Sequence, residues 1–272
     1  MWNSKDVYYI SDSTGILITN LGQALICQFP EINFNEEKFP FVRTVKEAKK
    51  TMAYILKRSG GRRPLIFSTI LDAKIRAIFN SPEVEFFDAF GQFLERLETC
   101  LEAPALQEPG FARHLDDLTM SRRVEAIHFC LEHDDGTKLE EYEEADIILL
   151  GVSRAGKTPI SVYLATQMGL KSANFPLTEE YFTRYRMPDG IIQNLDRVVA
   201  LTTSAQLLSS VRGKRYRDST YARLTTCIDE LHQAQRLFQK HKIPVVNTAG
   251  KSIEETATQV MHELGISKKT LR

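Results

Sequence analysis

The sequence predicts an α/β protein made of an N-terminal α/β domain and a second α/β domain with a mostly parallel sheet. Strand and helix patterns alternate through both halves of the chain, which is typical of α/β folds. A length of 272 residues suffices for two domains of ordinary size. Residues 103–110 contain two prolines and a glycine and are expected to form a linker. We therefore place the domains at residues 1–105 and 106–272.

In the N-terminal half, short apolar runs predict strands and longer periodic segments predict helices. The expected strands are residues 7–10, 64–69 and 84–87. The expected helices run from just after Gly15 to about Phe29, over residues 45–57 and over residues 90–102. This order is typical of an α/β domain.

The C-terminal half continues the alternation. The expected strands are residues 145–150, 197–202 and 243–247, and the expected helices are residues 120–131, 159–169, 219–240 and 252–264. Ser252 and Glu255 have the spacing of a capping box, so we expect the last helix to begin there.

The composition is that of a globular protein and excludes some classes of function. Lys and Arg total 35, as do Asp and Glu, and this balance argues against broad electrostatic binding to nucleic acid or an anionic membrane. No apolar run approaches the roughly 20 residues that cross a bilayer, and the first strand begins too early for a signal peptide. The cysteines are far apart in apolar helical stretches, and we expect them to be small core residues of a cytoplasmic protein: Cys27, Cys100, Cys130 and Cys227.

A phosphate-binding loop is the most specific motif in the chain. Residues 151–158 match G-x-x-x-x-G-K-[ST] and stand between an expected buried strand and an expected helix, as such a loop requires. Backbone N–H groups of the loop and the positive end of the helix are expected to hold phosphate oxygens. Lys157 is expected to reach the terminal phosphates, and the Thr158 hydroxyl to ligate Mg²⁺. The residues expected to bind nucleotide are Gly151, Val152, Ser153, Arg154, Ala155, Gly156, Lys157 and Thr158. The C-terminal domain is therefore predicted to be P-loop kinase-like.

Phosphoryl transfer also needs carboxylates, which orient or deprotonate the acceptor hydroxyl and hold Mg²⁺. The expected strand 197–202 ends in Thr202-Thr203-Ser204, where common nucleotide hydrolases carry an Asp. Asp134 and Asp135, just before the strand that precedes the loop, are the candidates to replace it. The alternative is that residues 133–136 form an ordinary solvated turn.

Residues 11–15, Ser-Asp-Ser-Thr-Gly, form a second polar junction between a strand and a helix. They are suited to bind an anion or an acceptor chain at a helix N-terminus. The alternative is plain N-capping of the helix by Asp12 or Ser13.

Four cations lie within six residues: Arg212, Lys214, Arg215 and Arg217. Such a segment either closes over phosphates, docks an acidic partner or forms a solvated loop.

The loop and its flanking segments resemble the regulatory proteins of the dikinases that make phosphoenolpyruvate. The resemblance lies in residues 125–136, 151–159 and 163–165. It extends over nearly the whole chain, because residues 9–15, 219–222 and 252–257 also match, in the same order.

The resemblance implies a bifunctional phosphotransferase. In one direction, a kinase activity that uses ADP and Mg²⁺ transfers the β-phosphate of ADP to a threonine of the dikinase. This threonine lies near the dikinase's catalytic histidine, and its phosphorylation inactivates the dikinase. In the other direction, inorganic phosphate attacks the phosphothreonine and gives pyrophosphate and active dikinase. The loop is then expected to hold the diphosphate, with Lys157 neutralising charge on the moving phosphoryl group. Asp135, with Asp134 beside it, is expected to activate the threonine.

The family has two branches, and the target follows from the branch. The Gly156-Lys157-Thr158 form of the loop is closer to the branch that acts on phosphoenolpyruvate synthase (pyruvate, water dikinase). The alternative partner is pyruvate, phosphate dikinase. Two further alternatives are a P-loop kinase for a small metabolite, with the N-terminal domain as a lid or oligomer contact, and a non-catalytic nucleotide sensor. A homodimer is compatible with the sequence, which does not determine the oligomeric state.

Overall fold

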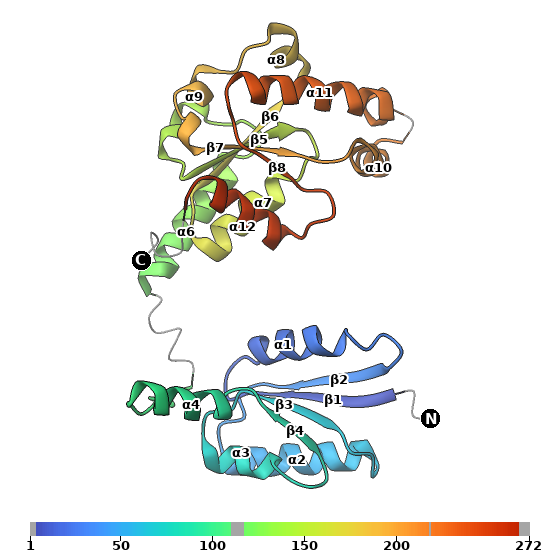
Figure 1. The fold of residues 1–272 in the computed structure, drawn as a ribbon, viewed down its shortest axis with the longest axis vertical. Coiled ribbons are helices and arrows are strands. Elements are labelled where there is room, and N and C mark those ends of the chain that lie inside the picture. Colours follow the sequence, from blue (N-terminus) through green and yellow to red (C-terminus); the bar gives the residue numbers. More distant parts are fainter. Residues whose placement is uncertain (1–3, 110–116, 218, 267–272) are drawn as a thin grey trace. The chain divides into compact units, whose positions relative to one another are not determined.

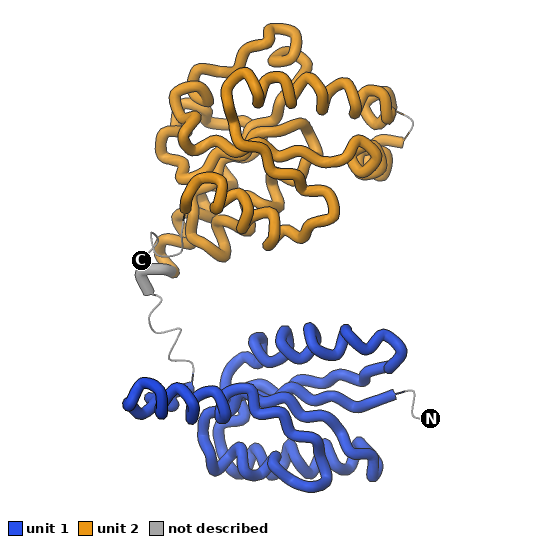
Figure 2. The backbone as a smooth tube through the Cα atoms, in the orientation of Figure 1, with its two compact units in different colours: residues 1–114 blue, residues 115–272 orange. Residues whose placement is uncertain are grey.

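The computed structural model describes residues 4–109, 117–217 and 219–266. The chain forms two compact units, Met1–His114 and Leu115–Arg272 (Figure 2). Each unit contains a four-stranded, all-parallel sheet. The prediction of an α/β protein is therefore confirmed.

The N-terminal unit is a three-layer structure with the strand order β2-β1-β3-β4. Its strands are β1 (Ser4–Ile10), β2 (Asn33–Phe39), β3 (Leu65–Ser68) and β4 (Glu85–Asp88), and its helices are α1 (Ile16–Ile26), α2 (Val45–Ser59), α3 (Ala73–Phe79) and α4 (Gly91–Leu101). Side chains alternate between the two faces of β1. Val7 and Tyr9 pack with α1, whereas Tyr8 and Ile10 pack with α2 and α3 on the other face (Figure 1).

The C-terminal unit has the strand order β6-β5-β7-β8. Its strands are β5 (Ile147–Val152), β6 (Ser172–Leu177), β7 (Val198–Thr202) and β8 (Val245–Asn247). Its α-helices are α6 (Asp117–Glu132), α7 (Lys157–Tyr163), α8 (Glu179–Arg184), α9 (Asp189–Ile192), α10 (Ala205–Arg215), α11 (Leu224–Lys240) and α12 (Ile253–Glu263). The short 3₁₀ helices are η1 (Leu139–Glu144), η3 (Leu195–Arg197) and η4 (Thr220–Ala222), and η2 (Leu164–Met168) is a π-helical turn. Helices α6, α7 and α12 lie on one face of the sheet, and α8 and α11 on the other (Figure 1).

The strand order places a topological switch point between β5 and β7. From β5 the chain passes through α7 to β6 on one side, and then returns to β7 on the other side of β5. Helices that leave β5 and β7 therefore diverge and leave a crevice at the carboxyl ends of these two strands, where α/β sheets bind ligands. The predicted phosphate-binding loop, residues 151–158, begins with the last two residues of β5.

Several elements were not predicted because their sequences lack the expected apolar pattern. Strand β2 is an edge strand rich in charged residues, and β6 carries Ser172, Asn174 and Pro176. Helices α3, α8, α9 and α10 were also missed. The predicted helix 219–240 begins only at Leu224, after the separate turn η4.

The prediction for the cysteines is wrong for half of them. Cys130 and Cys227 are buried, but Cys27 and Cys100 are exposed. Cys27 comes just after the last residue of α1, and Cys100 lies near the end of α4, so neither faces a core. Among the described residues, no helix is both long and apolar enough to cross a bilayer.

Candidate active site

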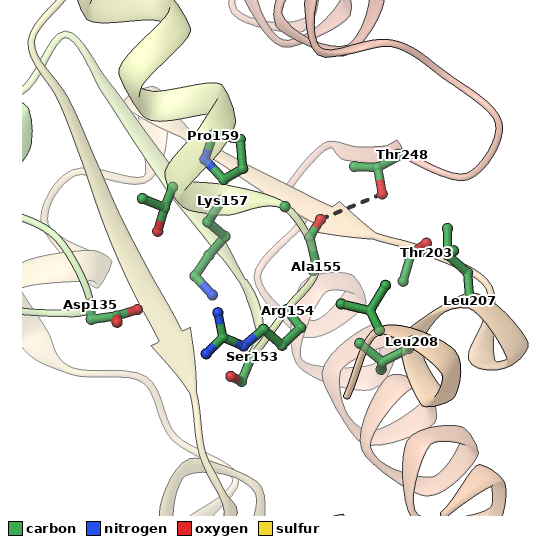
Figure 3. A pocket seen from close by; sticks show the side chains of 13 residues that line it. Asp135, Ser153, Arg154, Ala155, Lys157, Pro159, Thr203, Leu207, Leu208 and Thr248 are labelled. Atoms are coloured by element: carbon green, nitrogen blue, oxygen red, sulfur yellow. Dashed lines mark hydrogen bonds between the residues drawn. The ribbon is translucent and has the colours of Figure 1, made fainter. Parts of the chain in front are cut away.

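A cavity of about 410 Å³ opens at the carboxyl ends of β5 and β7 (Figure 3). One wall is the segment from Ser153 to Pro159, and the opposite wall is the connection from β7 into α10. The residues of this second wall are Thr203, Leu207, Leu208 and Val211. Asp135 and Thr248 complete the lining. The motif, the switch point and the cavity therefore coincide.

Glycines set the path of the loop. Gly151 belongs to β5, and a Cβ atom there would lie 2.6 Å from the Leu201 carbonyl oxygen of the neighbouring strand. Gly156 has a φ of 96° immediately before α7, a conformation that side chains disfavour. Of the predicted nucleotide-binding residues, Gly151 and Val152 are part of the strand and do not line the cavity, whereas those from Ser153 to Thr158 do.

Lys157 is buried, with 5% of its surface exposed. Its Nζ donates a hydrogen bond to the Val152 carbonyl oxygen at 3.2 Å. Burial lowers the pKa of the amino group to about 8, although Asp135 and Asp134 partly oppose the shift. An anion in the cavity would favour the charged form of the amino group. Phosphate binding is therefore expected to keep Lys157 fully protonated.

Asp134 meets the loop at Thr158. The Thr158 hydroxyl donates a hydrogen bond to Asp134 Oδ1 at 2.9 Å, and the Asn174 side-chain amide donates to the same oxygen. An Asp carboxylate, which is absent from the end of β7, thus lies beside the loop in the turn before β5. Together the Thr158 hydroxyl and the Asp134 carboxylate form a pair of hard oxygen donors, of the kind that Mg²⁺ takes while keeping water and substrate phosphates as its other ligands.

Asp135 lines the same cavity and lies on the side of Lys157 away from Leu207 and Leu208 (Figure 3). Its backbone has a φ of 51°, and its N–H donates to Asn174 Oδ1 at 3.0 Å. Within the described residues, its carboxylate accepts no hydrogen bond. Asp135 is exposed and lies in a turn, so its carboxylate is open both to solvent and to a ligand in the cavity.

Asn174, on β6, organises the turn that carries both aspartates and was not predicted from the sequence. Its side chain bonds to Asp134 and to the Asp135 N–H, and its carbonyl oxygen accepts from the Gly136 N–H at 2.9 Å. Its own N–H donates to the His133 carbonyl oxygen at 3.0 Å. One signal could have indicated it: an Asn inside an otherwise buried strand needs hydrogen-bond partners.

Two hydroxyl groups border the cavity near β7. Thr203 is 8% exposed, and its Oγ1 has no hydrogen-bond partner within the described part of the chain. A buried hydroxyl without a partner is costly, so a ligand in the cavity would stabilise it. Thr248 donates to the Ala155 carbonyl oxygen at 3.4 Å, as drawn in Figure 3.

The cationic run lies mostly on a helix, not in a solvated loop. Arg212, Lys214 and Arg215 belong to α10. Arg212 is fully buried, whereas Lys214, Arg215 and Arg217 are exposed. The run therefore divides into one internal cation and three surface cations, and the internal one, Arg212, contacts the loop at Ser153.

The N-terminal junction at residues 11–15 does not cap its helix as predicted. The N-cap of α1 is Gly15, which makes no side-chain cap hydrogen bond. Asp12 is buried, and its carboxylate accepts from the Leu71 N–H at 2.8 Å. Ser11 accepts a hydrogen bond from Thr69 at 3.0 Å. The junction therefore links the carboxyl ends of β1 and β3, and the alternative that Asp12 or Ser13 caps the helix is wrong.

Known proteins resemble the whole chain. The sequence model of the family described as kinase/pyrophosphorylase matches residues 7–261. A protein of Desulfotalea psychrophila named "Putative phosphoenolpyruvate synthase regulatory protein" is 47% identical over 264 residues, which cover 97% of each chain. Proteins of the same name from Pseudoalteromonas atlantica (38% identical, covering 97% of this chain and 99% of the relative) and Hahella chejuensis (37% identical, covering 97% and 98%) match as fully. The resemblance noted in the sequence is thereby confirmed, and the chain belongs to the kinase/pyrophosphorylase family.

Proposed function

We propose that this protein is a bifunctional phosphotransferase that inactivates and reactivates phosphoenolpyruvate synthase. One activity is an ADP-dependent protein kinase that acts on a threonine near the synthase's catalytic histidine. The other is a phosphate-dependent phosphorylase that removes the phosphoryl group as pyrophosphate. Membership of the kinase/pyrophosphorylase family and the names of the relatives support this proposal. The observation that carries it in the structure is that Lys157 and Asp135 line one cavity.

In the forward reaction, the threonine hydroxyl oxygen attacks the β-phosphorus of ADP. The hydroxyl proton passes to the Asp135 carboxylate, and the bond from the β-phosphorus to the bridging oxygen breaks to release AMP. Backbone N–H groups of the loop and the Lys157 ammonium stabilise the negative charge on the moving phosphoryl group. Lys157 is buried beside the cavity, where its electrostatic effect is stronger than in water.

The reverse reaction uses the same groups. An oxygen of inorganic phosphate attacks the phosphorus of phosphothreonine, the bond to the threonine oxygen breaks, and pyrophosphate forms. Asp135 gives a proton to the departing threonine oxygen and is restored by the proton that the attacking hydrogen phosphate loses, so no net proton is left over. One anion-binding loop can thus serve both directions.

Thr158 and Asp134 are the residues that would hold Mg²⁺. When bound, the ion would neutralise part of the diphosphate charge. The described residues contain no cluster of three or more acidic, His or Cys side chains suited to a metal. Two protein oxygens fit an ion that is carried in largely by the nucleotide phosphates.

The function is tested by incubating the protein with ADP, Mg²⁺ and either phosphoenolpyruvate synthase or pyruvate, phosphate dikinase. We expect mass spectrometry to find one phosphothreonine on the synthase, and added phosphate to remove it with formation of pyrophosphate. A label on the second dikinase alone would identify the alternative target. A label on neither would overturn the proposal and leave a small-metabolite kinase or a nucleotide sensor.

We place the activity in the cytoplasm, where the exposed thiols of Cys27 and Cys100 stay reduced.

The pKa of Lys157 predicts how ADP binding depends on pH. Because burial lowers this pKa to about 8, the free protein loses the Lys157 charge as the pH rises through that value. The bound diphosphate favours the protonated amine, so binding above pH 8 takes up a proton and weakens by up to about tenfold for each pH unit. Calorimetry at several pH values, in two buffers of different ionisation enthalpy, measures both effects. Lys157→Arg should remove the dependence, because arginine stays charged. Equal affinity of the wild-type protein at pH 7 and pH 9.5 would contradict the prediction.

A further inference from the structure

One buried arginine holds the phosphate-binding loop from outside the cavity. The guanidinium of Arg212, on α10, donates to the Ser153 carbonyl oxygen at 3.1 Å and to the Tyr221 carbonyl oxygen at 3.1 Å. It also pairs with Glu230 on α11 at 2.6 Å. Its Cζ lies 4.0 Å from the centroid of the Tyr221 ring. No part of Arg212 is exposed, and it does not line the cavity.

Tyr221 completes this contact by holding the side chain of the same serine. Its hydroxyl donates to Ser153 Oγ at 2.8 Å. Both the carbonyl oxygen and the hydroxyl of Ser153 are therefore engaged by Arg212 and Tyr221, neither of which lines the cavity. We call these three residues the Ser153 clamp.

The clamp fixes the direction of one backbone amide. In a planar trans peptide the C=O and the N–H point in opposite directions. Arg212 draws the Ser153 carbonyl oxygen toward buried structure, so the N–H of Arg154, in the same peptide, points the other way, toward the cavity. Arg154 has a φ of 74°, a left-handed conformation that turns successive N–H groups inward to form an anion-binding nest. Within the described residues, the Arg154 N–H has no hydrogen-bond acceptor.

We propose that Arg212 and Tyr221 are positioning residues for phosphoryl transfer, and that they act by aiming the Arg154 N–H at the bound phosphate. This inference rests on the proposed function of the loop. Neither residue contacts the reacting atoms. The proposal also assigns the Ser153 hydroxyl to the clamp and not to the phosphate. Because Leu207, Leu208 and Val211 of α10 line the cavity, one helix both forms a wall of the site and holds the loop.

The sharpest test is Tyr221→Phe, which removes one hydroxyl and keeps the ring against Arg212. We expect ADP and inorganic phosphate to bind about 2- to 10-fold more weakly, because one hydrogen bond that orients the loop is lost. Arg212→Lys keeps a charge for Glu230 but loses the planar fork, and we expect about 10- to 100-fold weaker binding. In both variants, KM for ADP should change more than kcat, because the amide contacts the phosphate before transfer as well as during it.

A double-mutant cycle separates the clamp from general destabilisation. If the clamp acts through Ser153, Tyr221→Phe should have little further effect in a Ser153→Ala background. Tyr185→Phe and Arg197→Lys are matched controls, because their hydrogen bonds go to Arg236, Glu143 and Ala145, away from the loop. Both should bind ADP like the wild-type protein.

Wild-type affinity for ADP and phosphate in Tyr221→Phe, or full additivity with Ser153→Ala, would overturn the clamp. Tyr221→Phe decides the question even if Arg212→Lys fails to fold. The proposed function is tested separately. If the wild-type protein labels neither dikinase, but the Tyr221→Phe variant binds ADP more weakly than the wild type does, the clamp is supported and the proposed function is wrong.

Discussion

Lys157→Ala is expected to abolish phosphoryl transfer in both directions, with a loss of at least about 10³-fold. The Lys157 amino group is buried in the loop and lines the cavity, so no solvent ion can replace it efficiently. Forward and reverse reactions pass through similar charge on the moving phosphoryl group. The loss should therefore be seen both in phosphothreonine formation from ADP and in pyrophosphate formation from phosphate.

The same substitution should not unfold the protein. Because burial lowers the pKa of Lys157, the charged amino group reduces the free energy of unfolding at neutral pH. Its removal is therefore expected to leave the melting temperature unchanged or raised. Lys171→Ala is a matched control, since Lys171 is partly buried but pairs with Glu125 and Glu144. Transfer activity retained by Lys157→Ala, with the fold intact, would exclude the proposed mechanism.

The strand, turn and helix around residues 151–158 could be predicted because their determinants are local. A run of apolar residues forms β5, and the glycines that follow allow the close approach at Gly151 and the positive φ at Gly156. Lys157 and Thr158 then begin a helix. Everything that this part of the site needs lies within about a dozen consecutive residues, so no knowledge of the sheet was required.

The groups around the loop could not be predicted, because they depend on strand pairing. Asn174 reaches the two aspartates only because β6 lies beside β5, with Leu149 and Asn174 in register. Arg212 meets Ser153 across 59 positions of sequence. A run of four cations predicts four exposed side chains. Only the packing of α10 against α11 reveals that one of them, Arg212, is buried. The role of Asp12 could not be predicted for the same reason, because its partner, the Leu71 N–H, is brought near by β3.

Asp135→Asn and Asp134→Asn are expected to fail in different ways, although the two residues are adjacent. Asp135→Asn removes the proposed proton acceptor without changing the shape of the side chain. We expect the forward and reverse rates to fall by about 10²- to 10⁴-fold. ADP binding should be unchanged or tighter, because a negative charge that lines the cavity is gone.

Asp134→Asn instead replaces a charged oxygen by a neutral one in the pair of oxygens proposed to bind Mg²⁺, Asp134 Oδ1 and the Thr158 hydroxyl. Its main effect should be a higher Mg²⁺ concentration for half-maximal rate, and excess Mg²⁺ should restore much of the activity. Single-turnover rates measured against Mg²⁺ concentration distinguish the two variants, with Asp189→Asn on the surface as the control. Should Asp135→Asn keep the wild-type rate, or regain it with added Mg²⁺, the proton must leave the threonine by another route. Asp135 would then serve the metal site or only the turn, because a base that acts on the acceptor cannot be replaced by more cation.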